Sequence, residues 1–354
     1  MIRHLCIGLL ALTPSLLLGL TGYVVNNTGN TVSVFDTETK TVIGTIPVGS
    51  LPGAIAIGGG NLYVTNFQDS TVSVIDMTTN QPIHTIGVDI EPIGIAVGGN
   101  SVYVANLRGG AGTGSVSVID MTTNSVITIN DPSFNFPVGF AYNGRYLYVA
   151  NEGLGPMGDG SISVIDTRIN AVTSSFTLGP PGSSSPIAIA IRENYAYVTN
   201  LIPNQVVNVA VFDTRDNTLV TYITDPSFIN SDAIVISGDE GYVANSASNS
   251  ITVLDLKKNT VKGVFTADLS PNPNGPVGIA VARNHIYISD YTDDVVTVVN
   301  LKNGEISTIS DPFSTFKDPT GIVLTTALYD INRLQPIYQI DYADAQNKLL
   351  DAGL

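Results

Sequence analysis

The residues Tyr63-Val64-Thr65-Asn66, followed by Val72-Ser73-Val74-Ile75-Asp76, decide the fold of this chain, because the same two blocks return along it. They recur, for example, at 103–106 with 116–120. The first block starts at Tyr23, Tyr63, Tyr103, Tyr148, Tyr197, Tyr242 and Tyr287, and the second ends at Asp36, Asp76, Asp120, Asp166, Asp213, Asp255 and Asn300. Seven copies make this an internal repeat that spans most of the chain.

The period of the repeat predicts its architecture. Successive second blocks end between 40 residues apart (Asp36 to Asp76) and 47 residues apart (Asp166 to Asp213). A period of about 40–45 residues with room for four short strands is typical of a β-propeller blade. In each unit we expect an inner strand A after a proline, the YVxN block as strand B, the V-x-V-x-D block as strand C and a looser outer strand D. Small, nearly continuous apolar residues such as those at 52–56 favour a strand A that is buried on both faces.

The two ends of the repeat region predict how the ring closes. The chain enters the repeat in a strand B at Tyr23, and its last unit at 319–324 is a strand A without the other three strands. The C-terminal strand A therefore completes the N-terminal blade, which removes the open sheet edges at the closure. Residues 23–324 are predicted to form an all-β, seven-bladed β-propeller, with a tail at 325–354 that has a possible short helix at 343–350.

On these motifs the chain resembles the YVTN-type β-propeller repeat proteins and is similar to YncE-like periplasmic proteins and to surface-layer propellers. The resemblance covers about residues 23–324 and implies the propeller fold, a surface or periplasmic location, and scaffolding or partner binding. Similar propellers also include lactone hydrolases. The chain departs from the pattern at Ser231-Asp232-Ala233, where strand A lacks its proline, and at Ile288-Ser289-Asp290 in the last YVxN block.

The N-terminus and the cysteine content favour export. Residues 1–22 carry Arg3 and His4 before an apolar run, which is typical of a secretory signal peptide; an uncleaved anchor is the alternative. Cys6 is the only cysteine, so a chain cleaved near residue 22 contains none. We expect a periplasmic, secreted or cell-surface protein without an integral membrane span after removal of the signal.

The charge of the chain restricts its partners. The formal net charge is −15 and the isoelectric point is about 4.3. Nucleic acids and anionic membranes are poor partners for such a chain, because both attract positive surfaces. A protein or cell-envelope component with a basic surface, or a small cationic ligand, is the expected partner.

The predicted loops place most acids on one face. Connections B–C and D–A are long and carry fourteen acids against Arg108 and Lys317, whereas the shorter A–B and C–D turns hold ten bases and twelve acids. Long loops on a rigid scaffold are where binding usually occurs. The candidate binding face comprises Asp69, Glu91, Arg108, Glu152, Asp159, Asp290, Asp293, Asp294 and Asp318. Acids that merely keep exposed loops soluble are the alternative.

Other polar patterns have structural explanations. The Asp or Asn that ends each strand C starts a turn, and its side-chain oxygen can accept hydrogen bonds from the backbone N–H groups of that turn. The Asn of each YVxN block is predicted to anchor the B–C loop. His4, His84 and His285 occupy unrelated positions, so no histidine metal cluster is expected. Three D–A loops contain Asp131-Pro132-Ser133-Phe134, Asp225-Pro226-Ser227-Phe228 and Asp311-Pro312-Phe313, whose Phe is predicted to pack between blades or, alternatively, to form an aromatic rim.

Three functions remain open at this point. The first is a non-enzymatic exported binding protein or scaffold that recognises its partner through the acidic long-loop face. The second is a lactonase-like hydrolase that uses carboxylates at the channel mouth, such as Glu152 or Asp290, or a bound divalent cation; no cofactor is otherwise expected, with Ca²⁺ the possible exception. The third is a structural surface-layer subunit. The sequence contains no cluster of catalytic residues, which favours the binding protein.

Overall fold

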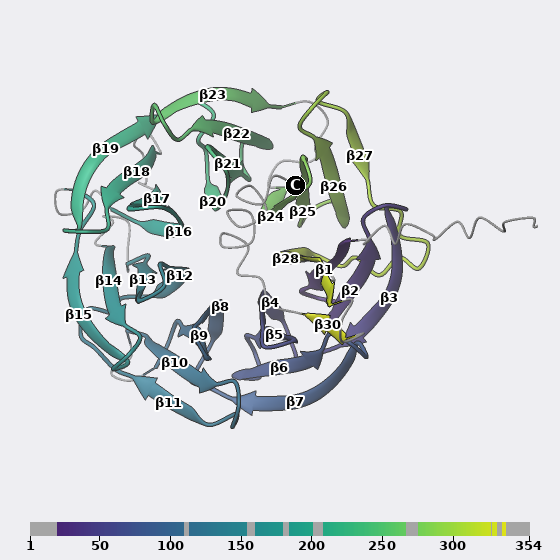
Figure 1. The fold of residues 1–354 in the computed structure, drawn as a ribbon, viewed down its shortest axis with the longest axis horizontal. Helices are drawn as coiled ribbons and strands as arrows, with labels where there is room; N and C mark the ends of the chain where they lie inside the picture. The colour runs from purple at the N-terminus through teal and green to yellow at the C-terminus, as the bar shows by residue number, and fades with distance from the viewer. Residues whose placement is uncertain are drawn as a thin grey trace, which may run out of the picture.

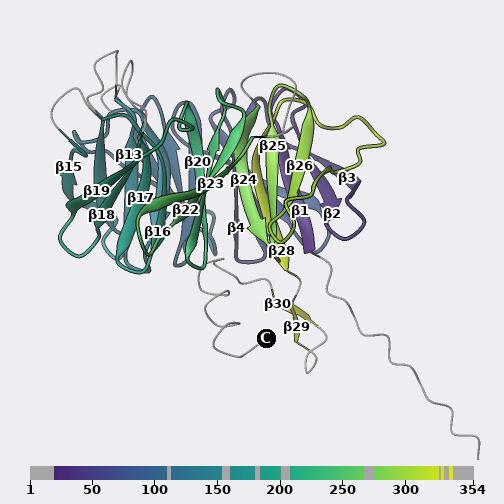
Figure 2. The same cartoon turned by 90° about the horizontal axis from the view of Figure 1, so that it is seen from above.

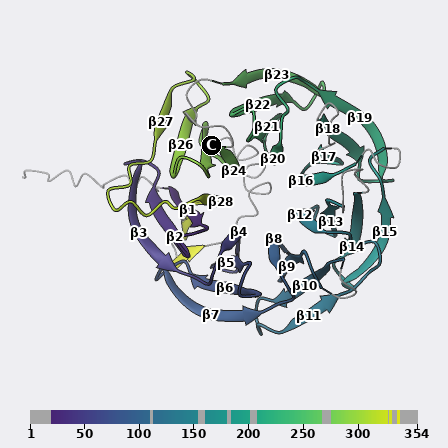
Figure 3. The ribbon, with the colours of Figure 1, turned by 180° about the vertical axis from the view of Figure 1, so that it is seen from behind.

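A computed structural model describes residues 20–109, 113–153, 160–179, 184–200, 208–266, 275–326, 328–330 and 335–337. Seven four-stranded antiparallel sheets form a closed ring in this structure (Figure 1). The predicted seven-bladed β-propeller is therefore confirmed. The opposite view shows the same order of blades around the centre (Figure 3).

The strands of each blade run from the centre of the ring outward. Blade 1 contains β28 (Pro319–Thr326), β1 (Leu20–Asn26), β2 (Thr31–Asp36) and β3 (Thr41–Pro47), and blade 2 contains β4 (Pro52–Gly58), β5 (Asn61–Asn66), β6 (Thr71–Asp76) and β7 (Gln81–Gly87). Blade 3 contains β8 (Pro92–Gly98), β9 (Ser101–Asn106), β10 (Ser115–Asp120) and β11 (Val126–Ile129), and blade 4 contains β12 (Pro137–Tyr142), β13 (Tyr146–Asn151), β14 (Ser161–Asp166) and β15 (Ala171–Phe176). Blade 5 contains β16 (Pro186–Arg192), β17 (Tyr195–Asn200), β18 (Asn208–Asp213) and β19 (Thr218–Thr224), and blade 6 contains β20 (Ser231–Ser237), β21 (Glu240–Asn245), β22 (Ser250–Asp255) and β23 (Thr260–Phe265). Blade 7 contains β24 (Pro276–Ala282), β25 (His285–Asp290), β26 (Val295–Asn300) and β27 (Ile306–Thr308).

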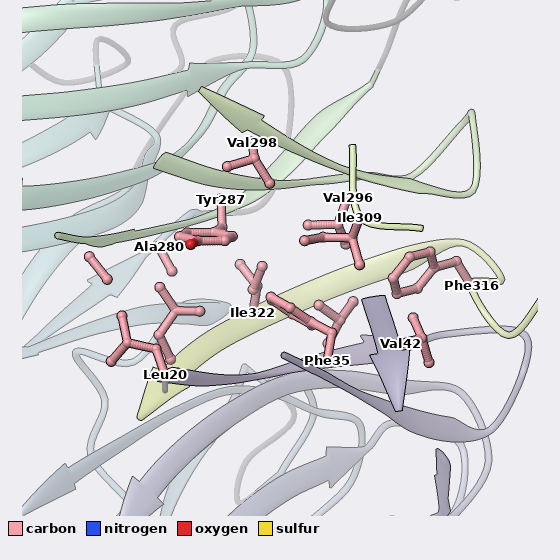
Figure 4. Close-up of a cluster of buried hydrophobic side chains, with 13 residues drawn as sticks. Leu20, Phe35, Val42, Ala280, Tyr287, Val296, Val298, Ile309, Phe316 and Ile322 are labelled. Atoms are coloured by element: carbon pink, nitrogen blue, oxygen red, sulfur yellow. The ribbon is translucent and has the colours of Figure 1, made fainter. Parts of the chain in front are cut away.

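The ring closes within blade 1, as the ends of the repeat predict. Strand β28 pairs antiparallel with β1, and Tyr23 lies opposite Val323. A buried apolar cluster joins blade 1 to blade 7 beside this pairing (Figure 4). In that cluster the rings of Phe35 and Tyr287 lie 5.9 Å apart between centroids. The C-terminal strand thus supplies both backbone pairing and apolar contacts to the N-terminal blade.

Strand β1 starts at Leu20, three residues before Tyr23. Leu20 is buried and pairs with Thr326, so the last three residues of the predicted leader, 20–22, form strand structure. Residues 1–19 of that leader lie outside the described residues. No helix of the length and hydropathy needed to span a membrane occurs in the part of the chain that the structure describes.

Buried polar side chains join strands B and C of most blades. Asn66 donates from Nδ2 to Thr71 Oγ1 and Ser73 Oγ, both at 2.9 Å. Asn245 makes the same pair of bonds to Ser250 and Thr252. These bonds cross the base of the B–C loop, so the predicted anchor role of the YVxN asparagine is confirmed there. The Ser and Thr hydroxyls thus supply the acceptors that the buried side-chain amide of the asparagine requires.

The YVxN tyrosine links neighbouring blades. Tyr103 Oη donates to Asn170 Oδ1 of the next blade at 2.9 Å, and Tyr23 Oη donates to Asn80 Oδ1 at 3.0 Å. Both asparagines adopt the left-handed conformation in a C–D turn, with φ of 50° and 54°. The repeat therefore encodes the contact between blades as well as the blade itself.

The inner strands are less buried than their sequence predicts. All residues of β12 after Pro137 are partly exposed, because no further strand covers the inner edge of a blade. The inner strands nevertheless approach one another closely near their first residues. A Cβ atom on Gly94 would lie 2.0 Å from the carbonyl oxygen of Val138 in blade 4, and one on Gly139 would lie 2.1 Å from that of Ile187 in blade 5. Glycine at these positions lets the blades converge on the centre.

A short hairpin follows the ring in the chain. Strand β29 (Leu328–Asp330) pairs with β30 (Gln335–Ile337), and both lie beyond one face of the ring (Figure 2). Residues 343–350, for which a short helix is possible, lie outside the described residues.

Candidate binding face

The direction of the strands divides the connections between two faces. We call the face with the B–C and D–A connections the long-loop face, and the face with the A–B and C–D turns the short-turn face. Strand β28 ends at the short-turn face, where the β29–β30 hairpin follows it (Figure 2). The candidate residues from the sequence belong to the long-loop face.

The aspartates that end strand C hold their own turns, as predicted. Asp76 Oδ1 accepts the backbone N–H groups of Thr78 and Thr79 at 2.8 and 2.9 Å. Asp120 accepts those of Thr122 and Thr123 in the same way. These hydrogen bonds to the carboxylates lower the pKa of both aspartates. The ring of aspartates is therefore a feature of the framework.

Oppositely charged side chains are paired on the short-turn face. Asp166 contacts the guanidinium groups of Arg168 and Arg145, which hold the pKa of its carboxyl well below the usual range. Arg215 lowers the pKa of Asp213 to about 2. With two exceptions, every ion pair among the described residues lies on this face. Its positive charge is thus largely compensated by adjacent acids.

The two exceptions account for both bases of the long-loop face. Arg108 Nε lies 3.2 Å from Glu91 Oε2, and Lys317 Nζ lies 3.3 Å from Asp294 Oδ2. The sequence places no other Lys or Arg in the loops of this face. The face therefore keeps an excess of negative charge.

Several candidate acids maintain loop structure. Asp69 Oδ2 accepts the backbone N–H of Ser50 at 2.7 Å. Asp294 Oδ1 accepts the N–H of Asp318 at 2.6 Å, and Asp318 in turn accepts the hydroxyl of Thr28. Hydrogen bonds of this kind order a loop. These acids can attract a cation or a basic partner, although substituting them would also disturb the loops.

Asp290 occupies the position that asparagine holds in the other YVxN blocks. Its side chain is buried and accepts the N–H groups of Thr292 and Asp293, both at 3.2 Å. Burial is the main cause that raises the pKa of Asp290. A buried anchor of this kind offers little surface to a ligand. Its neighbour Asp293 is partly exposed, and Asp159 lies outside the described residues.

Glu152 differs from the other described candidates because no cation or hydrogen bond from the residues that the structure describes stabilises its charge. Burial raises the pKa of Glu152, and the negative charge of Asp232 raises it further. Burial likewise raises the pKa of Asp232, against a hydrogen bond from Ser246. Glu152 follows β13 in blade 4 and Asp232 lies on β20 in blade 6, so the two carboxylates repel each other from different blades. Asp232 is absent from our predicted candidate face, although the missing proline at Ser231 was a signal for it.

The Asp-Pro loops follow the packing prediction in two of three cases. Phe134 and Phe228 are buried between blades, with 0% and 3% of their surface exposed. Phe313 was predicted to pack in the same manner, and this was wrong: its side chain is 65% exposed. Phe316 is buried in its place, because Asp311 here accepts the N–H groups of Thr315 and Phe316 in a longer turn.

A repeated backbone junction surrounds the long-loop end of the inner strands, and sequence reasoning missed it. The residue before strand A adopts a left-handed conformation, with φ between 48° and 58°, and its carbonyl accepts the N–H of the residue after the YVxN asparagine. Phe136 O accepts from Glu152 at 2.9 Å, and Leu51 O from Phe67 at 3.1 Å. Left-handed residues at this junction are Leu51, Glu91, Phe136, Asn230 and Asp318. The junction joins the residue before each of these inner strands to the start of the B–C loop of the same blade.

Neither histidine nor acid clusters mark a metal site. In the described ranges, no group of three or more His, Cys, Asp or Glu side chains is arranged to hold a metal ion. His84 lies on the outer strand β7 and His285 starts β25, far apart in the ring (Figure 1). Carboxylates of the long-loop face remain the candidates for a cation.

Comparisons with known proteins support the fold and no more specific relationship. No protein-family model and no curated protein sequence matches the chain. Among solved structures, the chain is similar to a functionally unknown protein from Desulfotomaculum acetoxidans, with 18% identity, a TM-score of 0.67, and 86% of this chain and 98% of that chain covered. It is also similar to a chain of Kuenenia stuttgartiensis hydrazine synthase (18% identity, TM-score 0.65, 81% and 91% covered). A third similar structure is apo AztD from Citrobacter koseri (13% identity, TM-score 0.55, 91% and 99% covered). At these identities the likeness shows the propeller fold alone, and the resemblance to YVTN-type proteins remains at that level.

Proposed function

We propose that this protein is an exported, non-enzymatic binding protein that recognises a basic surface of a protein or cell-envelope partner through its long-loop face. The observation that carries the proposal is the contrast in charge compensation between the two faces. Acids of the short-turn face are paired with Arg and Lys, whereas those of the long-loop face have only Arg108 and Lys317. An uncompensated field on one face of a rigid ring attracts a partner of opposite charge and orients it.

The location of the protein is part of the proposal. The apolar segment at residues 1–22 and the restriction of cysteine to Cys6 support export.

The test is affinity purification from envelope and secreted fractions with two matched charge-reversal variants. The first carries Glu91→Lys and Glu152→Lys on the long-loop face, and the second carries Glu38→Lys and Glu305→Lys on the short-turn face. Each variant changes the formal charge by the same amount, and none of these four carboxylates accepts a backbone N–H from a described residue. We expect partners that bind the wild type to be lost from the first variant and kept by the second. Partners retained by the first variant and lost from the second would refute the proposal.

One observation favours a second candidate, a hydrolase that acts at the centre of the long-loop face. Glu152 and Asp232 are carboxyls with raised pKa, as a general acid or base requires. A panel of lactones, assayed with and without a chelator, tests it. Turnover that is lost in Glu152→Gln would support the hydrolase, and no turnover under either condition would eliminate it.

A further inference from the structure

The chain crosses from blade 7 to blade 1 between β27 and β28, and consecutive residues of this crossing bond to different blades. Ile309 N donates to Val296 O of blade 7 at 2.9 Å. Ser310 N donates to Lys40 O at 2.7 Å, and Ser310 O accepts Val42 N at 2.9 Å, both in blade 1. Ser310 thus forms a parallel bridge at the outer edge of β3. We call this pairing of Ser310 with β3 the outer clasp.

Side chains on both sides of the outer clasp support it. Lys40 Nζ donates to Ser307 Oγ at 2.6 Å. Ile309 and Phe316, which are 3% and 2% exposed, pack with Val42 in the apolar cluster that joins blades 7 and 1 (Figure 4). Backbone bonds, a side-chain bond and buried apolar surface therefore hold the clasp together.

The same phrase occurs at two other crossings without a clasp. Ser310, Asn130 and Thr224 each stand directly before an Asp-Pro loop. Thr224 pairs with Asn208 in its own blade, and Asn130 is exposed. Within the described ranges, neither Asn130 nor Thr224 forms a backbone bond to the outer strand of the next blade. An Asp-Pro loop therefore folds without the clasp.

Other contacts of the crossing are shared with its counterparts. Thr315 Oγ1 lies 2.8 Å from Ser33 Oγ of β2, and Ser133 Oγ at the crossing to blade 4 lies 2.8 Å from Ser163 Oγ of β14. Such a hydroxyl contact joins each loop to strand C of the next blade. The outer clasp is the feature that distinguishes the crossing from blade 7 to blade 1.

The crossing to blade 1 also differs in how the chain continues. In blades 2 to 7, strand A leads along the chain into strands B, C and D of the same blade. In blade 1, strand A is β28, and it joins β1 from the other end of the repeat region through pairing and packing. Local opening of a folded protein concentrates where chain ends are held by contacts alone. This seam is therefore where the ring needs an additional fastening.

We propose that the crossing from blade 7 is a strap that closes the ring at two points, through β28 at the inner edge of blade 1 and through the outer clasp at its outer edge. The two points lie at opposite edges of one four-stranded sheet, in the order β28-β1-β2-β3. Release of the clasp loosens β28 from β1, although three strands separate β28 from the site of the change.

Native-state amide hydrogen exchange of the full chain tests the strap with Ser310→Pro, which removes the N–H that donates to Lys40 O. Asn130→Pro is the matched control, because Asn130 has the same place before an Asp-Pro loop and no clasp. Ser307→Ala is a milder variant that removes only the bond from Lys40 Nζ. Exchange of β1 and β28 is compared with that of the inner pair β12 and β13 in blade 4.

We expect amides of β1 and β28 to exchange at least about tenfold faster in Ser310→Pro, about threefold faster in Ser307→Ala, and at the wild-type rate in Asn130→Pro. Exchange in β12 and β13 should stay unchanged in all three variants.

Three results would overturn the proposal: acceleration confined to the residues around Lys40 and Val42, equal acceleration of the two inner pairs, or equal effects of the two proline variants. If Ser310→Pro does not fold, Ser307→Ala decides, and wild-type exchange of β1 and β28 in that variant would refute the strap.

Discussion

Carboxylates on the two faces of this propeller experience opposite environments. On the short-turn face, backbone amides and neighbouring Arg or Lys groups lower the pKa of Asp76, Asp213 and Asp239. On the long-loop face, burial raises the pKa of Glu152, Asp232 and Asp290. Hydrogen bonds and ion pairs thus favour the charged form of the first set, whereas burial favours the neutral form of the second set.

The difference shows which face is framework. At the short-turn face the repeated residues bond to one another: Asp76 accepts the backbone of its own turn, and Asn170 accepts the hydroxyl of Tyr103 from the preceding blade. On the long-loop face the backbone junction repeats, while the side chains that it presents change from blade to blade. Unequal side chains on an equal backbone are the feature expected of a binding surface.

The largest effect is expected where the blades converge at the long-loop end of the inner strands. Gly94→Ala places a methyl group 2.0 Å from the carbonyl oxygen of Val138, so that neighbouring blades must separate. We expect a loss of about 3 kcal/mol in the free energy of unfolding, measured with urea. Gly44→Ala on β3 is the control, since nothing lies within 4 Å of its added Cβ. Equal midpoints for the two variants would show that the inner strands can spread without cost.

A smaller loss is expected for the links between blades at the short-turn face. Asn170→Ala removes the acceptor of Tyr103 Oη and forces Ala into a backbone with φ of 50°. The expected loss is about 2 kcal/mol, with each of the two effects worth about 1 kcal/mol. Asn170→Gly tolerates the backbone and should lose only the first half. A Gly variant as unstable as the Ala variant would contradict the role assigned to the left-handed conformation.

Sequence reasoning was most successful where the repeat is regular. The seven blades, the closure through 319–324, the Asp turns and the Asn anchors follow from copies that agree with one another. The left-handed junction before strand A was missed, because residues as different as Leu51, Glu91 and Asp318 adopt it and no residue type marks it. Phe313 was misplaced because one longer turn moves the buried aromatic to Phe316.

The third prediction concerns the buried acid of the long-loop face. Burial raises the pKa of Asp290, so the folded state binds its proton more tightly than the unfolded chain, whose value is near 3.8. The resulting stabilisation grows as the pH falls from the raised pKa toward that value, and it is lost as the pH rises through the raised pKa. Asn at this position resembles the protonated acid and can donate to strand C as Asn245 does. Asp290→Asn should therefore gain about 1 kcal/mol at neutral pH.

Urea unfolding of wild type and Asp290→Asn at neutral and at mildly acidic pH measures this effect. The gain should shrink as the wild-type carboxyl becomes protonated. A gain that stays constant with pH would mean that Asp290 is not held in a disfavoured charged state.

The smallest effect is expected for an ion pair of the short-turn face. Asp166→Asn removes the contacts to Arg145 and Arg168, which lower the pKa of the aspartate, so the stabilisation is present at neutral pH and is lost as the pH falls through the lowered value. We expect a small decrease in Tm at pH 7 that diminishes with added salt, because the arginines are well exposed. Lys302→Ala, which removes an exposed base of the same face that forms no ion pair with the described residues, is the control. A decrease that is insensitive to salt would indicate a steric rather than an electrostatic contribution.

Amide hydrogen exchange of the complex with a captured partner tests the central claim most directly, because it reports both faces of every blade at once. The account predicts new protection in the D–A and B–C loops of the long-loop face, and unchanged exchange in the C–D turns of the short-turn face. Protection that appears in the C–D turns, with the long loops unchanged, would contradict it.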